Sequence, residues 1–302
     1  MSGAAAIGLS ALLLYSVPAA AGGGPGNRPA AEGQRDPPPA LEPRGVPHLA
    51  SVPAQLAYAR RAKAAMTGTE GRERMRRRWD AARAFVAVRS YFPGEPCAGA
   101  EATFRAAELL RGGGDLEQAL RELGLARDLC TAGPFHARGV LEIGHLQRRL
   151  GRAREALDAY EELYAGDGVP RAVRDEATLW AGRVHQQAGR TEEARRLWER
   201  AAREAEDPVQ RVRAYDELAL VLIERGDLEG AAGMLERSRR ALHEVAQERT
   251  PLGERVRGAL GRMRAIAALR HSVERRRGTV RIDRGADRDG GREKKISTGE
   301  KF

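Results

Sequence analysis

The hydrophobic positions between residues 96 and 250 recur with the period of an α-helix. Leu120, Leu123 and Ala126 are three residues apart, and the same spacing recurs later in the chain. Residues spaced by three or four positions lie on one side of a helix, with the polar residues between them on the other side. The pattern therefore predicts amphipathic helices, each with one apolar stripe to bury.

A short motif repeats through the same segment. It consists of a glycine, four mostly polar residues and an alanine, as from Gly114 to Ala119. The alanines of successive copies are 37 or 38 residues apart, and a proline falls between one copy and the next. The motif alanines are Ala119, Ala156, Ala194 and Ala231, and the prolines are Pro96, Pro134, Pro170, Pro208 and Pro251. Four copies with two markers in phase indicate a repeated structural unit.

Each unit reads as two antiparallel helices. Its glycine suits the left-handed backbone conformation that often ends a helix, and the acidic residues after it favour the start of a second helix. Its alanine allows close contact between the two helices, and the proline ends the second one. Because a single pair cannot bury its apolar stripe, the units are expected to stack on one another.

These units resemble the tetratricopeptide repeat (TPR). The family's small residue late in the first helix matches Ala107, Gly144, Gly182 and Ala219, and its large second-helix residue matches Leu123, Tyr160, Trp198 and Leu235. The family's early tryptophan position departs from the pattern and holds Thr103, Val140, Thr178 and Tyr215. The units are also longer than the family's usual 34 residues. In this respect they are similar to a longer variant found in exported bacterial envelope proteins. The resemblance implies an all-α fold, a right-handed α-solenoid of stacked antiparallel helix pairs.

Segments of different composition flank the repeats. Prolines crowd the stretch before residue 52, and the chain beyond residue 277 is rich in glycine, aspartate and arginine, which favours disorder. The predicted organisation is a signal peptide at 1–21, a disordered Pro/Gly-rich linker at 22–51, a divergent N-terminal helix pair at 52–95, four TPR-like repeats at 96–250, a C-terminal capping helix at 251–277 and a disordered basic tail at 278–302.

The N-terminal leader consists of an apolar run at residues 4–17 and a small-residue exit that ends at Ala21. A run of this length is typical of a secretory signal peptide and is too short to span a membrane. Because no Lys or Arg precedes the run, two alternatives remain: the leader is not cleaved, or the start codon was wrongly chosen. We expect a periplasmic, cell-envelope or secreted bacterial protein, or a cytoplasmic one if the leader is not a true signal. Membrane contact is expected only through an uncleaved leader.

The net charge of +10 is concentrated in two segments. Residues 60–90 hold ten basic and three acidic side chains, and residues 268–302 hold eleven basic and six acidic ones. Such segments can bind nucleic acid or an anionic envelope polymer electrostatically. Only four of the 52 basic residues are lysines, however, which indicates that the codon bias of a GC-rich genome accounts for much of the charge. Nucleic acid is therefore not the expected partner.

The two cysteines lie at the beginning and at the end, along the chain, of one predicted helix pair. Cys97 is at the start of the first helix and Cys130 is at the end of the second. These ends are neighbours in an antiparallel pair, so we expect a disulfide, which would fit an exported protein. The alternative is two free thiols in a reducing cytosol.

No pattern of catalytic or metal-binding residues stands out in the sequence. The six histidines are scattered without the His-x-x-x-His or His-Glu-x-x-His spacing of a helical metal site, and no Gly-x-Ser-x-Gly motif occurs. We therefore expect no enzyme activity, no cofactor and no metal.

The TPR resemblance assigns ligand-binding positions to the first helix of each repeat, on the face that lines the family's concave groove. In the middle repeats these are Arg138, Leu141, His145, Arg148, Arg149, Leu179, Arg183 and Gln186, and the same mapping includes Glu101 and Glu108 in the first repeat. Arginine guanidinium groups bind carboxylates through paired hydrogen bonds. The groove is thus expected to suit an acidic or C-terminal peptide, although these arginines can equally be surface residues produced by codon bias.

Together these features predict a non-catalytic scaffold or adaptor of the bacterial envelope that presents a concave groove to a protein or peptide partner. The alternative is the electrostatic binder of nucleic acid or anionic polymer, acting through residues 60–90 and the C-terminal tail.

Overall fold

The computed structural model describes residues 38–275, and their regular structure is entirely α-helical. The predicted signal peptide at 1–21, residues 22–37 of the predicted linker and the predicted tail at 278–302 lie outside the described residues. No helix within the described part is long and apolar enough to cross a membrane.

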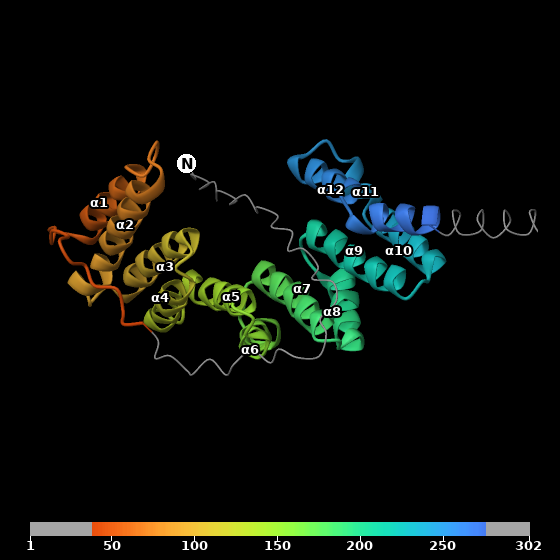
Figure 1. Ribbon diagram of the computed structural model, residues 1–302, viewed down its shortest axis with the longest axis horizontal. Helices are drawn as coiled ribbons and strands as arrows, with labels where there is room; N and C mark the ends of the chain where they lie inside the picture. Colours follow the sequence, from red (N-terminus) through yellow and green to blue (C-terminus); the bar gives the residue numbers. More distant parts are fainter. Residues whose placement is uncertain (1–37, 276–302) are drawn as a thin grey trace, which may run out of the picture. The chain divides into compact units, whose positions relative to one another are not determined.

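Ten of the helices form five successive pairs, each joined by a short turn (Figure 1). We call the first helix of a pair the A helix and the second the B helix. The pairs are α1 (Val52–Ala64) with α2 (Gly71–Tyr91), α3 (Pro96–Gly113) with α4 (Leu116–Leu129), α5 (Pro134–Arg149) with α6 (Ala153–Ala165), α7 (Arg171–Gln187) with α8 (Thr191–Glu204), and α9 (Pro208–Glu224) with α10 (Leu228–Ala241). Each helix packs against the helices before and after it in the chain. The predicted all-α architecture of stacked helix pairs is confirmed.

The motif glycines end the A helices in the backbone conformation that their sequence suggested. Gly114 has φ 91° and Gly151 has φ 77°, and Gly189 and Gly226 occupy the same place with similar angles. A side chain at these φ values would be strained, so glycine allows the chain to reverse within a few residues. The reversal brings each B helix back along its A helix.

Close contact within a pair depends on a small residue of the A helix that faces a large residue of the B helix. Gly144 of α5 lies against the ring of Tyr160 in α6, and Gly182 of α7 lies against the indole of Trp198 in α8. Both rings are almost completely buried. The TPR-like positions of the sequence are therefore the contact points of the helix pairs.

Residues 38–51, which we call the N-terminal strap, are held by contacts to the helices, although they belong to the linker at 22–51 that was predicted to be disordered. The backbone N–H of Leu41 donates to Glu122 Oε1 at 2.7 Å, and Arg89 donates to the carbonyl oxygen of Leu41 at 2.9 Å. Arg89 also forms an ion pair with Glu122, whose side chain is completely buried. The segment is ordered because it satisfies these buried charges, which lie on α2 and α4.

The C-terminal end also departs from the prediction of a single helix over 251–277. A short helix α11 (His243–Gln247) is followed by α12 (Pro251–Gly261), and the chain then breaks before a further helix at residues 264–275. At this break the backbone N–H of Ala265 donates to Asp216 of α9 at 2.8 Å. A carboxylate at a helix start stabilises the exposed N–H groups there, so Asp216 fixes where the last helix begins.

Cys97 and Cys130 are joined by a disulfide, with 4.9 Å between their Cα atoms. Cys97 lies in the first turn of α3, and Cys130 follows the last residue of α4. Because the two helices are antiparallel, these positions meet at one end of the pair. The bond closes the α3–α4 hairpin on the side opposite its glycine turn.

We expect Gly144→Ala to lower the free energy of unfolding by about 1–3 kcal/mol. The added Cβ would lie 2.6 Å from Tyr160 Cε1, and the buried ring has little room to move. Gly124→Ala is the matched control in the interior of α4, because its Cβ would meet nothing within 4 Å. The control should be neutral or stabilising by up to about 1 kcal/mol. Urea unfolding measures the free energy of unfolding of both variants. Equal effects of the two substitutions would show that the contact between Gly144 and Tyr160 is not what limits the side chain at position 144.

We expect the Cys97→Ser, Cys130→Ser double variant to lower the free energy of unfolding by about 3–4 kcal/mol. The disulfide spans a sequence separation of 33 residues, and a loop of that size restricts the unfolded chain by roughly this amount. Urea unfolding of the oxidised protein is compared with the variant and with the reduced protein. If the reduced and oxidised proteins unfold at the same urea concentration, the bond contributes nothing to stability.

Candidate functional site

The A helices of successive repeats lie beside one another in addition to packing on their B helices. Contacts join α3 to α5, α5 to α7, and α7 to α9. We call the surface formed by these helices the A-helix face. It carries the positions that the TPR resemblance assigned to ligand binding.

Polar side chains cross from each A helix to the next along this face. Arg111 of α3 pairs with Glu142 of α5, and His145 Nε2 lies 3.7 Å from Glu176 Oε1 of α7. Arg183 of α7 donates to Glu217 of α9 at 2.6 Å. Each of these contacts joins a basic side chain to a carboxylate of the following repeat, so they fix how one repeat sits on the next.

Of the predicted ligand-binding residues, His145 contacts Glu176, and four others also have contacts within the protein. Leu141 is 7% exposed and Leu179 is 3% exposed, so both belong to the hydrophobic core and cannot reach a ligand. Arg183 is engaged by Glu217, and Gln186 donates to Glu224 of α9 at 3.0 Å. The resemblance placed these residues on the A helices, where the burial of Leu141 and Leu179 and the pairing of Arg183 and Gln186 give their side chains contacts within the protein.

Trp180 of α7 is the centre of an aromatic and cationic cluster between α5 and α7. The guanidinium groups of Arg148 and Arg183 each lie 4.4 Å from the centre of its ring. The ring of His145 meets it edge-on, with 5.1 Å between the ring centres. Guanidinium groups at this distance are attracted to the indole π-system. Trp180 is not among the predicted ligand-binding residues, although its position between Leu179 and Arg183 on one helix was a usable signal.

His145 links this cluster to two titrating groups. Its Nδ1 lies 2.8 Å from the Tyr160 hydroxyl, and burial raises the pKa of Tyr160 far above its ordinary value of 10.0. Tyr160 is therefore a neutral phenol at physiological pH. Burial also opposes the ionisation of Glu176. Hydrogen bonds from His145 and Trp180, together with the charges of His145 and Arg213, outweigh it and hold the pKa of Glu176 below its ordinary value of 4.5.

Three arginines of α5 have no carboxylate partner within residues 38–275. They are Arg138, Arg148 and Arg149. Arg138 is exposed and lies over the ring of Phe104, 5.1 Å from its centre, and Arg149 is exposed at the end of the helix. Eleven residues separate Arg138 from Arg149, which is close to three helical turns and places them on the same side of α5. Arg138 and Arg149 are thus the arginines of the predicted set that the structure leaves exposed for binding an anion, whereas Arg148 is half-buried against Trp180.

Within the described part of the chain, no group of three or more His, Cys, Asp or Glu side chains is placed to hold a metal ion.

Solved structures of TPR-like repeat proteins resemble this chain in fold. The TPR-like repeats of a kinesin light chain from Podosopora anserina align with 66% of this chain and 100% of their own, at 15% identity and a TM-score of 0.49. MamA aligns with 66% of this chain and 96% of its own, at 16% identity and a TM-score of 0.47. BtubC from P. vanneervenii aligns with 83% of this chain and 97% of its own, at 14% identity and a TM-score of 0.47.

No protein-family model and no curated protein matches the sequence. The structural likenesses have TM-scores below 0.5, and the helix pairs of the chain itself establish its architecture.

We expect Glu176→Gln to destabilise the protein at neutral pH, with an effect that fades in acid. The pKa of Glu176 is lowered in the folded state, so its ionised form stabilises the fold above about pH 4.5, and this contribution is lost as the pH falls through the lowered pKa. Urea unfolding at about pH 7 and about pH 3 measures the difference between wild type and variant. Glu155→Gln, on the exposed side of α6, is the matched control. If the difference in free energy of unfolding between wild type and Glu176→Gln is the same at both pH values, the ionised carboxylate of Glu176 is not what stabilises the fold.

Proposed function

We propose that this chain is a non-catalytic scaffold that binds a protein partner along its A-helix face. Stacked repeats form extended surfaces, and such surfaces suit the recognition of peptides and domains better than the enclosure of a small substrate. The observation that carries the proposal is the set of α5 arginines, Arg138, Arg148 and Arg149, which have no carboxylate partner in the described part while their neighbours on the same face do.

The chemistry of these residues favours an acidic segment or a C-terminal carboxylate of the partner. An exposed guanidinium binds a carboxylate with two parallel hydrogen bonds, which gives direction as well as affinity. The rings of Phe135 and Trp180 lie beside the arginines, so apolar side chains that flank the acidic group would also find contacts. Aromatic and arginine side chains together are typical of the residues that dominate binding energy at interfaces.

An exported location in the bacterial envelope is part of the proposal. The signal-like leader at 1–21 supports it, as does the Cys97–Cys130 disulfide, because disulfides persist in oxidising compartments and are rare in the bacterial cytosol.

The electrostatic alternative has less support from the residues described. In the basic segment 60–90, Arg77 pairs with Glu73, Arg83 with Asp80 and Arg89 with Glu122, so part of its positive charge is already neutralised. Binding through this segment would weaken steeply between low and moderate salt.

The test is partner capture by chemical cross-linking in the native cells, quantified by mass spectrometry. We expect the Arg138→Glu, Arg149→Glu variant to recover at least tenfold less of the specific partner than wild type. Arg154→Glu, Arg196→Glu is the matched control, because both of its arginines are exposed on B helices and the change in net charge is the same. Circular dichroism must show unchanged helicity in both variants.

If both variants lose the partner equally, net charge rather than the A-helix face determines binding, and the electrostatic alternative is favoured. If both retain it, the A-helix face is not the binding surface.

A further inference from the structure

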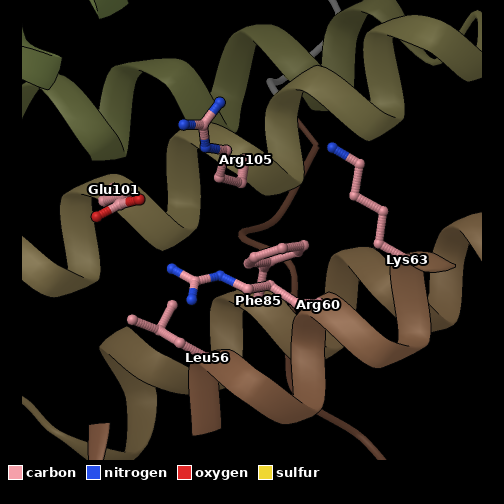
Figure 2. Close-up of a pocket in the computed structure, with 6 residues that line it drawn as sticks. All are labelled: Leu56, Arg60, Lys63, Phe85, Glu101 and Arg105. Atoms are coloured by element: carbon pink, nitrogen blue, oxygen red, sulfur yellow. The ribbon is translucent and has the colours of Figure 1, made fainter. Parts of the chain in front are cut away.

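The A-helix face is interrupted at its N-terminal end. Whereas α3, α5 and α7 each contact the next A helix, α1 packs on α2 and makes almost no backbone contact with α3. A pocket of about 200 Å³ opens in the gap, and the buried ring of Phe85 of α2 is part of its lining (Figure 2). The lining residues are Leu56, Arg60, Lys63, Phe85, Glu101 and Arg105.

The charged side chains of this pocket are not paired with one another. Arg60 and Lys63 come from α1 and Glu101 comes from α3, and none of the three has an ion pair or side-chain hydrogen bond within residues 38–275. Arg105 donates to Glu108, outside the pocket, at 3.0 Å. Elsewhere on the A-helix face a basic group on one helix contacts a carboxylate on the next. Between α1 and α3 the same kinds of groups are present but remain free for an external partner.

The size of the pocket limits what it can hold. Sites for small molecules and cofactors usually measure about 300–1,000 Å³, so this pocket is suited to one side chain of a larger partner. Its charge limits the occupant further. With Arg105 engaged by Glu108, the free groups are two cations and one carboxylate, which leaves a net charge of +1. A carboxylate matches this charge, whereas a phosphate monoester carries about −1.5 to −2 at neutral pH.

We propose that this pocket binds an internal Asp or Glu side chain of a partner peptide together with an adjacent apolar residue. The carboxylate is held by Arg60 and Lys63, which rise from α1 on either side of the Phe85 ring (Figure 2). The apolar neighbour packs on Leu56, and Glu101 on the α3 side accepts a backbone N–H of the peptide. The proposal rests on the scaffold function above and names a point where the partner is anchored.

The test is a titration of the full chain followed by nuclear magnetic resonance of the Leu56 methyl groups. The probe is leucyl-aspartyl-leucine with an acetylated N-terminus and an amidated C-terminus, so its only charge is the side-chain carboxylate. We expect the Leu56 resonances to shift with the aspartyl peptide and to stay unchanged with the matched asparaginyl peptide. Arg60→Ala, Lys63→Ala should raise the Kd at least tenfold, because two charge-assisted hydrogen bonds are lost.

Arg61→Ala, Arg76→Ala removes two exposed cations that do not line the pocket, and it should change the Kd less than twofold. Equal weakening by the two double variants would overturn the proposal, as would equal binding of the asparaginyl peptide or no shift at millimolar peptide. Tighter binding of a matched peptide with phosphoserine in place of the aspartate would overturn the choice of a carboxylate. A response to anionic phosphatidylglycerol vesicles alone would identify the pocket as a lipid-headgroup site.

The capture assay separates this proposal from the scaffold function. If Arg60→Ala, Lys63→Ala captures the partner as wild type does while Arg138→Glu, Arg149→Glu does not, the pocket proposal fails and the scaffold function stands. If the pocket binds the aspartyl peptide but neither variant affects capture, the pocket stands and the partner binds elsewhere.

Discussion

The rest of the structure depends on the close approach of two helices within each repeat. Gly144 against Tyr160 and Gly182 against Trp198 leave no space for even one additional methyl group. Such packing buries large rings without polar atoms left unsatisfied, since the Trp198 indole N–H donates to the carbonyl oxygen of Leu179 at 3.2 Å. Each pair is then a rigid unit whose outer surfaces must be covered by the next pair, and stacking follows from this requirement.

Stacking in turn decides which charges are available for function. Once the A helices lie beside one another, Arg111, His145 and Arg183 reach carboxylates of the following repeat. Removing one partner from such a half-buried pair leaves a charge without compensation, so these residues are better regarded as parts of the architecture. The arginines left over on α5, and the unpaired groups between α1 and α3, are therefore the places where this surface can interact with another molecule.

The two ends of the stack are closed by different means. At the N-terminal end the strap crosses α2 and α4 and is held by the buried Arg89–Glu122 pair, next to a hairpin that the disulfide closes. At the C-terminal end the chain turns before residue 264, so that Arg264 pairs with Asp216 and Glu217 of α9. Terminal repeats lack a neighbour on one side, and both devices cover surface that an interior repeat would bury against the next one.

The sequence by itself determined the helix pairs, because their markers are local. A glycine that ends a helix, an alanine at a close contact and a proline between units each act within a few residues, so their spacing of 37 or 38 residues is enough to place the eight helices of the four repeats. The disulfide could be predicted from the same helix positions, since it joins the start of the first helix to the end of the second helix of one predicted pair.

Only the tertiary structure decided which side chains are free, because their partners lie far away in the chain. Leu41 meets Glu122 across 81 residues, Arg183 meets Glu217 across 34, and Ala265 meets Asp216 across 49. A proline-rich composition therefore predicted disorder where a buried carboxylate orders the strap. A family resemblance likewise predicted a free arginine where the next repeat supplies its counter-ion. Local rules act over one helical turn, whereas burial and charge pairing depend on which repeat lies alongside.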